Sequence, residues 1–223
     1  MDNLTLVIPA KHEKESLPVV LKEIEKYNLE TLIILEESDK ETINSIKNHN
    51  CKIIFQRNKG YGDALIEGIN TVKTEFFCIF NADGSFRPEE LEFMLEISKT
   101  KNYDLVFGSR YEKNSSSDDD TIITLIGNKI FSLMGKIFFS LPITDILYTF
   151  VIGKTEKVKK LNIKSKDFCF CVELPIKAQK NNLNLTSTPA NERKRIAGKK
   201  KVNAFRDGFK ILISMLKLKF NLL

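Results

Sequence analysis

The sequence feature that most constrains the fold is a short apolar run that ends abruptly in polar residues. Residues 76–80, FFCIF, are followed at once by the polar segment NADGS. An apolar run of this length between turn residues is typical of a buried strand in a parallel sheet. Ligands of open α/β sheets bind just beyond the carboxyl ends of the strands. The polar segment therefore stands where a ligand site is expected.

The polar segment has two explanations. Asn81 and Asp83 offer the hard oxygen ligands that Mg²⁺ or Mn²⁺ takes, and such an ion can carry the diphosphate of a substrate. Alternatively, Asn81, Asp83 and Gly84 only turn the chain and cap a helix that begins near Pro88. These residues alone do not distinguish a metal site from a simple turn, so the motifs in the rest of the chain are needed.

Strands and helices are expected to alternate through the first half of the chain. Strands are expected at 4–8, 31–35, 51–55, 76–80 and 104–107, and helices at 16–27, 39–48, 88–98 and in a segment that ends near residue 72. Further helices are expected at 154–161 and 170–181, and a further strand at 183–188. Polar residues follow the early strands. This pattern predicts a three-layer α/β fold with a mostly parallel sheet and one ligand cleft.

Two later segments are strongly apolar on at least one face. Residues 121–141 are mostly apolar, with Asn128, Ser132 and Lys136 forming a narrow polar stripe. A helix of this kind belongs either in the core or in a membrane interface. Residues 203–220 combine an apolar face with lysines and arginines, which is typical of helices that bind anionic membrane surfaces.

The net charge of +6 is unevenly distributed along the chain. Residues 191–223 hold ten Lys and Arg against Glu192 and Asp207, which gives +8, so the other 190 residues sum to −2. A basic C-terminal segment on a slightly acidic body indicates an anionic partner, which is a nucleic acid, a phosphorylated ligand or a membrane surface.

Length and composition narrow the class of protein. A chain of 223 residues suits one structural domain, within which we distinguish a first half at 1–120, a second at 121–202 and a C-terminal helix at 203–223. The four cysteines have no metal-ligand spacing and indicate no disulfide framework, which favours a reducing compartment. We expect no signal peptide. No uninterrupted apolar stretch reaches the roughly 18 to 20 residues that span a bilayer.

Several motifs occur in an order that resembles a known family. They are VIPAKHE at 7–13, EES at 36–38, N-x-G-x-G-x-A-x-x-x-G at 58–68, NAD at 81–83 with PE at 88–89, GSR at 108–110, DILYTFV at 145–151, FCVEL at 170–174 and R-x-x-G-x-K-K at 195–201. The chain resembles the family 2 glycosyltransferases of GT-A fold, and within them the branch similar to dolichol-phosphate mannose synthase. The resemblance implies the Rossmann-like α/β/α fold of nucleotide-diphospho-sugar transferases, with C-terminal amphipathic interface helices.

The resemblance also implies which residues bind the donor and the metal. The donor-binding residues are Pro9, Ala10, Glu13, Glu36, Asn58, Gly60, Gly62, Ala64, Asn81, Ala82 and Asp83. Asn81, Asp83 and Ser85 are implied as ligands of Mg²⁺ or Mn²⁺. The glycines are expected to let the backbone approach the ligand closely.

The implied catalytic residues are Asp83, Arg110, Asp145, Arg195 and Lys201. Departure of a nucleoside diphosphate develops negative charge, which a metal ion on Asp83 would offset together with Arg195 and Lys201. Arg110 would hold the phosphate of a polyprenyl acceptor in line for attack. A lipid phosphate is already an anion and needs no strong base. A sugar hydroxyl would need one, and Asp145 is the candidate.

The implied function is inverting transfer of a sugar from a donor of the GDP-mannose or UDP-glucose type to a polyprenyl or dolichyl phosphate. The protein would act on the cytoplasmic face of a membrane, attached peripherally or through a separate anchoring subunit. Two alternatives remain. The acceptor is a saccharide hydroxyl in surface-glycan synthesis, or the chain is a non-catalytic relative that binds nucleotide-sugar or membrane, since residues 36–37, 81 and 149–151 depart from the family pattern. No nucleic-acid partner is expected.

Overall fold

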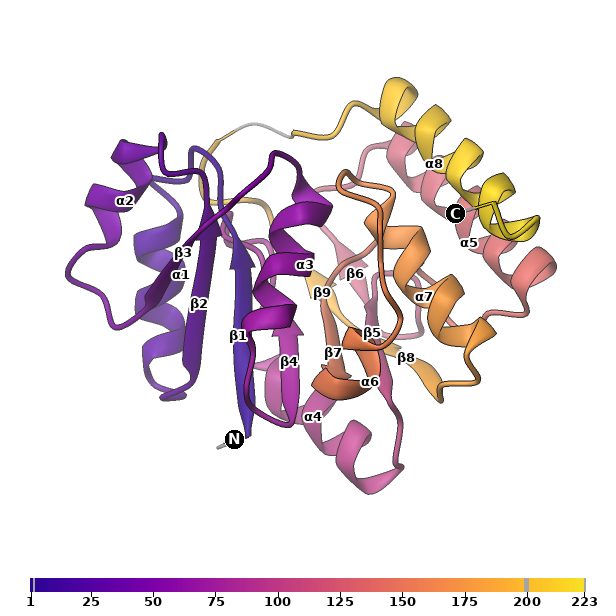
Figure 1. The fold of residues 1–223 in the computed structure, drawn as a ribbon, viewed down its shortest axis with the longest axis horizontal. Coiled ribbons are helices and arrows are strands. Elements are labelled where there is room, and N and C mark those ends of the chain that lie inside the picture. Colours follow the sequence, from indigo (N-terminus) through magenta and orange to yellow (C-terminus); the bar gives the residue numbers. More distant parts are fainter. Residues whose placement is uncertain (2, 199–200, 223) are drawn as a thin grey trace.

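A computed structural model describes residues 1, 3–198 and 201–222 of the chain. Its strands are β1 (Leu4–Pro9), β2 (Glu30–Leu35), β3 (Lys52–Phe55), β4 (Phe76–Ile79), β5 (Leu105–Ser109), β6 (Ser116–Ser117), β7 (Val151–Lys154), β8 (Leu185–Pro189) and β9 (Asn191–Glu192). Its helices are α1 (Leu17–Glu25), α2 (Lys40–Ile46), α3 (Tyr61–Thr71), α4 (Glu90–Thr100), α5 (Ile122–Phe139), α6 (Thr155–Lys159), α7 (Phe170–Lys180) and α8 (Ala204–Lys219). Strands and helices alternate up to β5, as the sequence predicts (Figure 1).

Seven of the strands form one sheet in the order β3-β2-β1-β4-β7-β5-β8. All neighbouring pairs are parallel except the two that involve β7, which runs antiparallel to both β4 and β5. The strand that precedes the polar segment, β4, lies in the middle of the sheet (Figure 1). The expectation of a mostly parallel α/β sheet is confirmed.

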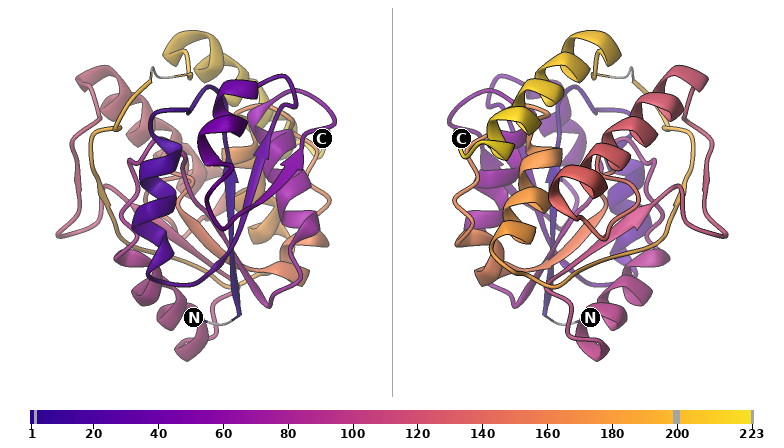
Figure 2. Two further views of the ribbon diagram at one scale, coloured as in Figure 1. Left: turned by 90° about the vertical axis from the view of Figure 1, so that its left-hand side faces the viewer. Right: turned by 90° about the vertical axis from the view of Figure 1, so that its right-hand side faces the viewer.

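Helices cover both faces of the sheet because successive strand side chains point in opposite directions. Val7 and Leu32 belong to a core that α3 and α7 complete, whereas Ile8 and Ile33 belong to a second core completed by α1 and α4. The strands are therefore apolar on both faces, as expected for a buried parallel sheet. The result is the predicted three-layer arrangement (Figure 2).

The sequence did not predict β7, or the pairing of β6 with β9. β7 comes from the second half of the chain yet lies between β4 and β5 of the first half. Gly153 is required there, because a Cβ atom on it would come within 2.8 Å of the Phe77 ring. The two-residue strands β6 and β9 pair in parallel at 116–117 and 191–192. Such short strands carry no periodicity, so only the folded chain reveals them.

Helices α5 and α8 pack beside each other at the edge of the molecule (Figures 1 and 2). The side chains of Thr121 and Asn203 cap their N-termini, accepting hydrogen bonds from Thr124 N at 3.3 Å and Arg206 N at 2.9 Å. By length and composition alone, the 18-residue α5 is apolar enough to cross a membrane. The sequence expectation concerned only uninterrupted apolar stretches, and α5 meets the length and composition limit although polar residues interrupt it.

Candidate active site

A cavity of about 780 Å³ lies beyond the carboxyl ends of β1, β2 and β4, where the polar segment was expected to form a site. Its lining is polar at one end, from loops after these strands, and apolar at the other, from α5 and α8. Twelve predicted site residues line it: Pro9, Ala10, Glu13, Glu36, Gly60, Ala64, Asn81, Ala82, Asp83, Arg110, Arg195 and Lys201. Four predicted residues lie outside the lining: Asn58, Gly62, Ser85 and Asp145.

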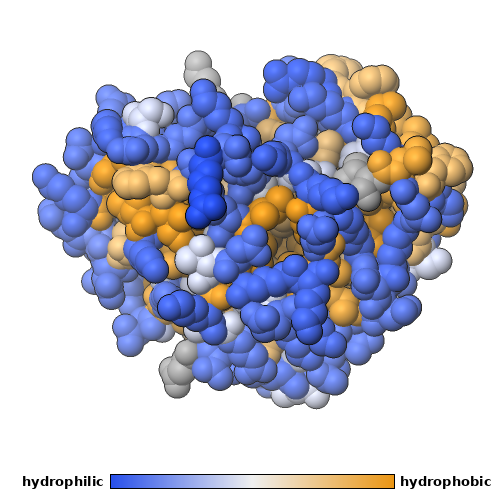
Figure 3. Space-filling model, in the orientation of Figure 1, coloured by the Kyte–Doolittle hydropathy of each residue, from blue (hydrophilic) through white to orange (hydrophobic). Residues whose placement is uncertain are grey.

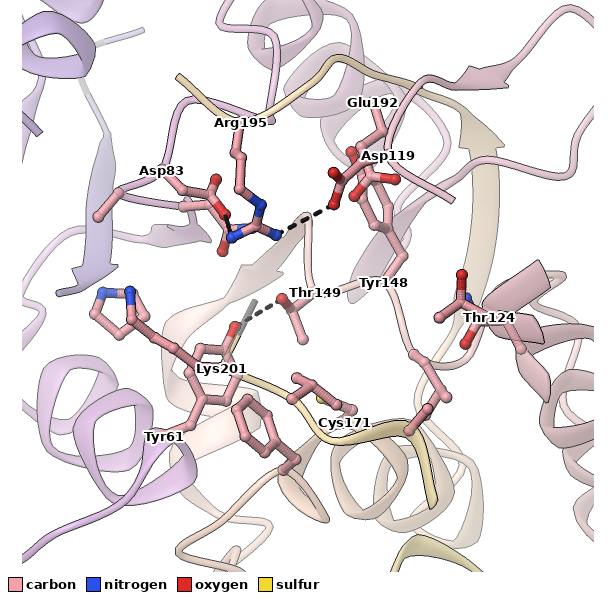
Figure 4. Close-up of a pocket in the computed structure, with 18 of the residues that line it drawn as sticks. Tyr61, Asp83, Asp119, Thr124, Tyr148, Thr149, Cys171, Glu192, Arg195 and Lys201 are labelled. Atoms are coloured by element: carbon pink, nitrogen blue, oxygen red, sulfur yellow. Dashed lines mark hydrogen bonds and ion pairs between the residues drawn. The ribbon is translucent and has the colours of Figure 1, made fainter. Parts of the chain in front are cut away.

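Asp83 and Arg195 form an ion pair in the centre of the polar end (Figure 4). Arg195 Nη1 lies 3.4 Å from Asp83 Oδ2, and Arg195 Nη2 donates to Asp119 Oδ2 at 3.2 Å. Asp83 Oδ1 accepts a hydrogen bond from the backbone N–H of Ser85 at 3.0 Å. Two predicted catalytic residues are thus in contact, although 112 positions separate them in sequence.

The residues around Asp83 fit a hard divalent cation that brings ligands of its own. Asn81 Nδ2 donates to Ser85 Oγ at 3.3 Å, and within the described ranges no group donates to Asn81 Oδ1. This amide oxygen and the Asp83 carboxylate are the oxygen atoms available as ligands for a metal ion. The described residues contain no cluster of three or more His, Cys, Asp or Glu side chains suited to a metal. Mg²⁺ and Mn²⁺ in sites of this type take one or two carboxylates, and water and substrate phosphates complete the shell.

Two further acids of the polar end are also paired with lysines. Lys201 contacts Glu13, whose other oxygen accepts from Ser16 Oγ at 2.6 Å. Lys11 Nζ donates to Glu36 Oε1 at 2.8 Å, and this hydrogen bond lowers the pKa of Glu36 below its ordinary value. Glu36 is therefore ionised at neutral pH. Residues 199 and 200 of the predicted basic loop lie outside the described residues.

The glycines at 60 and 62 permit a close contact with another segment of the chain. A Cβ atom on Gly60 would lie 2.1 Å from Lys166 O, and one on Gly62 would lie 2.2 Å from Ser165 O. Gly60 also has a φ of +127°, which other residues rarely adopt. The close approach that these glycines permit is to the backbone of the 165–167 loop. Gly60 also lines the cavity, whereas Gly62 does not, and the approach of this backbone to a ligand stays a prediction.

Glu173 holds that same loop in place from the first turn of α7. Its two oxygens accept from Lys164 N at 2.9 Å and Ser165 N at 2.6 Å, and Lys177 Nζ lies 2.7 Å away. Burial opposes ionisation of this carboxyl, but the three donors outweigh burial and hold the pKa of Glu173 below its ordinary value. Glu173 of the FCVEL motif therefore fixes the loop against which Gly60 and Gly62 lie.

Arg110 and Asp145 form a buried, two-pronged ion pair next to the cavity. Arg110 Nε donates to Asp145 Oδ2 at 2.7 Å, and Nη2 donates to Asp145 Oδ1 at 3.1 Å. Asp145 is fully buried and does not line the cavity. Burial opposes the charge of Arg110, but its carboxylate partners hold its pKa well above the ordinary value. A carboxylate enclosed in this way is poorly placed to act as a general base.

Glu192 is a cavity residue that sequence reasoning missed. Its Oε2 lies 3.3 Å from Arg110 Nη1 and accepts from Ser117 Oγ at 2.5 Å. Burial raises the pKa of Glu192 above its ordinary value, and Arg110 partly offsets this effect. Asp120 also approaches Arg110 Nη1, at 3.5 Å. With Asp145, three carboxylates surround this one guanidinium. The pairing of β6 with β9 brings Glu192 here, and no local pattern signals it.

Tyr148 and Tyr61 were also missed. The Tyr148 ring lies 4.6 Å from the Arg110 guanidinium, and its buried hydroxyl has no hydrogen-bond partner among the described residues. Tyr61 OH lies 2.7 Å from Thr149 Oγ1 (Figure 4). The Tyr61 ring stacks on Phe168. Both tyrosines line the cavity.

The apolar end of the cavity is a groove between α5 and α8. We call it the apolar groove and define it by Ile123, Gly127 and Phe131 of α5 and Phe205, Gly208 and Ile211 of α8. A Cβ atom on Gly127 would meet no described atom within 4 Å. The groove therefore has room beside Gly127, whereas a Cβ atom on Gly208 would lie 3.9 Å from the Phe131 ring.

The family to which the chain belongs follows from comparison with known proteins. The family model "Glycosyl transferase family 2" matches residues 5–162. The chain belongs to glycosyl transferase family 2, and it is a glycosyltransferase that uses a nucleotide-sugar donor. An uncharacterised glycosyltransferase of Mycobacterium tuberculosis is 25% identical over 212 residues, 95% of each chain. An uncharacterised protein of Methanocaldococcus jannaschii is 26% identical over 199 residues, 84% of this chain and 80% of that protein.

Solved structures confirm the GT-A fold. Glucosyl-3-phosphoglycerate synthase from Mycobacterium tuberculosis, crystallised with Mn²⁺, UDP and glucosyl-3-phosphoglycerate, superposes with a TM-score of 0.80 at 11% identity. The match covers 98% of this chain and 80% of that one. Mannosyl-3-phosphoglycerate synthase from Rubrobacter xylanophilus gives a TM-score of 0.70 at 13% identity, covering 98% and 73%. These likenesses establish the fold, and the narrower resemblance to dolichol-phosphate mannose synthase stays a prediction.

Proposed function

We propose that the protein transfers a sugar, with inversion, from a nucleotide-diphosphate donor to a polyprenyl phosphate at a membrane surface. The observation that carries this proposal is the position of the apolar groove. It continues the polar cavity and lies between two helices that expose many large apolar side chains. A lipid chain fits an apolar groove beside such a surface, whereas a water-soluble acceptor gains nothing from it.

The orientation of α5 supports a membrane interface. Ser132 Oγ accepts from Ile146 N at 3.1 Å, and Asn128 Nδ2 donates to Tyr111 OH at 3.0 Å, so these polar residues face the protein. The apolar residues face outward: Ile122, Ile123, Ile126, Ile130, Leu133, Ile137 and Phe138 are exposed. A helix in water normally has the reverse arrangement, and large exposed apolar patches mark interaction surfaces.

Helix α8 extends the same surface with basic residues. Phe205, Phe209, Ile213, Leu216 and Phe220 are exposed along it, and so are Arg206, Lys210, Lys217 and Lys219. Figure 3 shows apolar side chains gathered over this corner of the molecule, with polar groups beside them. Apolar residues that enter the interface and cations that attract anionic lipids together support peripheral attachment, which we assign to the cytoplasmic face.

The polar end suits a nucleoside diphosphate. Asp83 and Asn81 would hold Mg²⁺ or Mn²⁺, which supplies positive charge to the leaving diphosphate. Arg195 and Lys201, which line the same end, would bind the phosphate oxygens, and an arginine contacts two of them at once. Mn²⁺ and UDP in the crystals of a protein with the same fold are consistent with this assignment.

Arg110 would position the acceptor phosphate, and Asp145 would position Arg110. Asp145 engages Nε and Nη2 of the guanidinium, which fixes its plane. The remaining nitrogen, Nη1, has only longer contacts, at 3.3 Å to Glu192 and 3.5 Å to Asp120. We propose that a lipid phosphate takes the place of these acids at Nη1. Its oxygen is already charged, so attack on the sugar requires alignment rather than a base.

A second candidate function is transfer to a hydroxyl group. Three carboxylates around Arg110 make this end of the cavity net negative, which favours a neutral acceptor over an anionic one. Glu192 lines the cavity with a pKa raised by burial, so it replaces Asp145 as the candidate general base. The acceptor is then the hydroxyl group of a neutral saccharide.

A variant that fills the apolar groove distinguishes the two candidate acceptors, a polyprenyl phosphate and a hydroxyl group. Gly127→Phe places a large ring in open space within the groove. Gly127→Ala is the matched control, because it adds one methyl group that meets nothing within 4 Å in the described structure. For a lipid acceptor, the phenylalanine variant loses transfer to polyprenyl phosphate but keeps slow metal-dependent hydrolysis of the donor. Unchanged transfer to polyprenyl phosphate would contradict the proposed acceptor site.

A further inference from the structure

We infer that Arg195 is a resident counter-ion of the metal site, which occupies Asp83 until a nucleoside diphosphate draws it away. Free metal then binds weakly, and metal and donor bind as a coupled pair. We call the contact between these two residues the Arg195–Asp83 latch. The inference rests on the proposed function, because it takes Asp83 as the metal ligand.

The latch joins three segments that meet only in the folded chain. Arg195 contacts Asp83, at the turn after β4, through Nη1, and Asp119, between β6 and α5, through Nη2 (Figure 4). All three side chains line the polar end of the cavity. An incoming divalent cation would have to compete with a guanidinium for the Asp83 carboxylate, and the two cations repel each other at this distance.

The backbone on which Arg195 is mounted is held independently of its side chain. Ile196 N donates to Asp83 O at 2.8 Å, and Arg193 N donates to Ser85 O at 3.0 Å. The Ile196 side chain fills the space that a Cβ atom on Gly84 would need, 2.4 Å from Ile196 Cδ1. These contacts keep the segment against the turn. The guanidinium therefore changes partners by rotating its side chain, and no loop has to open.

The guanidinium also keeps one hydrogen-bond donor unused. Arg195 Nε is buried and has no partner in the part of the chain that the structure describes. A buried donor without an acceptor is unfavourable, and a phosphate group offers several acceptor oxygens to the edge of an arginine. A diphosphate would satisfy this donor while it releases Asp83. The nucleoside diphosphate that accompanies the metal therefore also favours the movement of Arg195 away from Asp83.

A coupling between two ligands is reciprocal. If the diphosphate frees Asp83 for the metal, then the metal on Asp83 makes Arg195 more available to the diphosphate by the same factor. The contact of Lys201 with Glu13 at the same end of the cavity gives a second cation that a diphosphate attracts. The site would thus reject free metal and accept the metal–nucleotide complex.

The latch is tested by measuring Mn²⁺ binding to the 223-residue chain without any sugar transfer. Free Mn²⁺ is followed by electron paramagnetic resonance, with and without UDP or GDP. Three variants are compared with the unmodified chain: Arg195→Gln removes the latch, Asp83→Asn weakens the proposed ligand, and Lys194→Gln is the matched control. Lys194 is an exposed neighbour that forms no ion pair with a described residue. Circular dichroism and thermal melting confirm that each variant is folded.

We expect Arg195→Gln to bind Mn²⁺ alone about tenfold more tightly, as removal of a partly buried competing charge predicts. Its gain in Mn²⁺ affinity on adding nucleotide should be smaller than that of the unmodified protein. Lys194→Gln should change the affinity less than about twofold, as for an exposed charge. Unchanged or weaker Mn²⁺ binding by Arg195→Gln would overturn the latch but leave the proposed function standing. If no variant binds Mn²⁺ even with nucleotide, both the latch and the metal site fail.

Discussion

Replacing Asp145 by Asn tests whether this residue positions Arg110 or acts as a base. The pair is buried, with 8% of the Arg110 side chain and none of the Asp145 side chain exposed. Asn keeps one acceptor oxygen but cannot hold two guanidinium N–H groups or balance the charge. Glu192 and Asp120 remain near Nη1 and partly compensate.

The size of the effect follows from this arrangement. Breaking a buried ion pair by removing one partner costs about 3 to 5 kcal/mol, because a buried charge is left without compensation. Because Glu192 and Asp120 remain near Arg110, we expect the loss of stability in Asp145→Asn to lie at the lower end of this range, about 3 kcal/mol. For a protein of this size the melting temperature should fall by about 6 to 12 °C.

Urea unfolding followed by circular dichroism measures the free energy of unfolding of each variant. The control is Glu41→Gln, which breaks an exposed pair with Lys14 at 2.9 Å and should change stability by less than about 1 kcal/mol. If Asp145→Asn unfolds within about 0.5 kcal/mol of the unmodified protein, while the turnover number falls steeply, then Asp145 is a base and our assignment is wrong.

Further predictions follow from individual contacts. Gly60→Ala should destabilise the protein and loosen the 165–167 loop, because its Cβ would lie 2.1 Å from Lys166 O at a φ of +127°; a melting curve within error of the unmodified one would contradict this. The pKa of Glu173 is lowered in the folded state, so its contribution to stability is present above about pH 4.5 and is lost as pH falls below that value. The stability difference between the unmodified protein and Glu173→Gln should therefore shrink in acid, and a difference that grows there would refute the assignment. Lys201→Gln should weaken UDP or GDP binding in calorimetry by about tenfold, as expected for loss of one charged phosphate contact. Phe209→Ser should reduce co-sedimentation with anionic vesicles, whereas equal binding, or binding only to duplex DNA, would contradict the membrane surface.

The sequence predicts those parts of the structure that depend on local signals. The apolar run at 76–80 and the polar residues after it specify a buried strand, observed at Phe76–Ile79, and its functional end without help from the rest of the chain. The same reasoning places β1, β2, β3, β5 and β8 within one or two residues. Because parallel strands end at one edge, most of the predicted donor residues line one cavity.

The remaining features depend on contacts between distant segments. β7 is recognisable as a strand only because it fills the space between β4 and β5. The pairing of β6 with β9 brings Glu192 to the cavity. Asp119 is held there by its ion pair with Arg195. The roles of Gly60 and Gly62 are set by the 165–167 loop, about 100 residues further along the chain. Local sequence patterns single out a glycine or an acidic residue, but its role depends on the distant residue that it contacts in the folded chain.

The most direct test of the central claim is transfer of a radiolabelled sugar to a polyprenyl phosphate. A panel of GDP-mannose, UDP-glucose and UDP-N-acetylglucosamine would be offered with undecaprenyl or dolichyl phosphate, in the presence of Mn²⁺ or of EDTA, to the unmodified protein and to Asp83→Ala. We predict an organic-extractable glycolipid with at least one donor, formed only with the metal and lost in the variant. Absence of a glycolipid with every donor, together with labelling of a soluble hydroxyl acceptor, would contradict the proposed reaction.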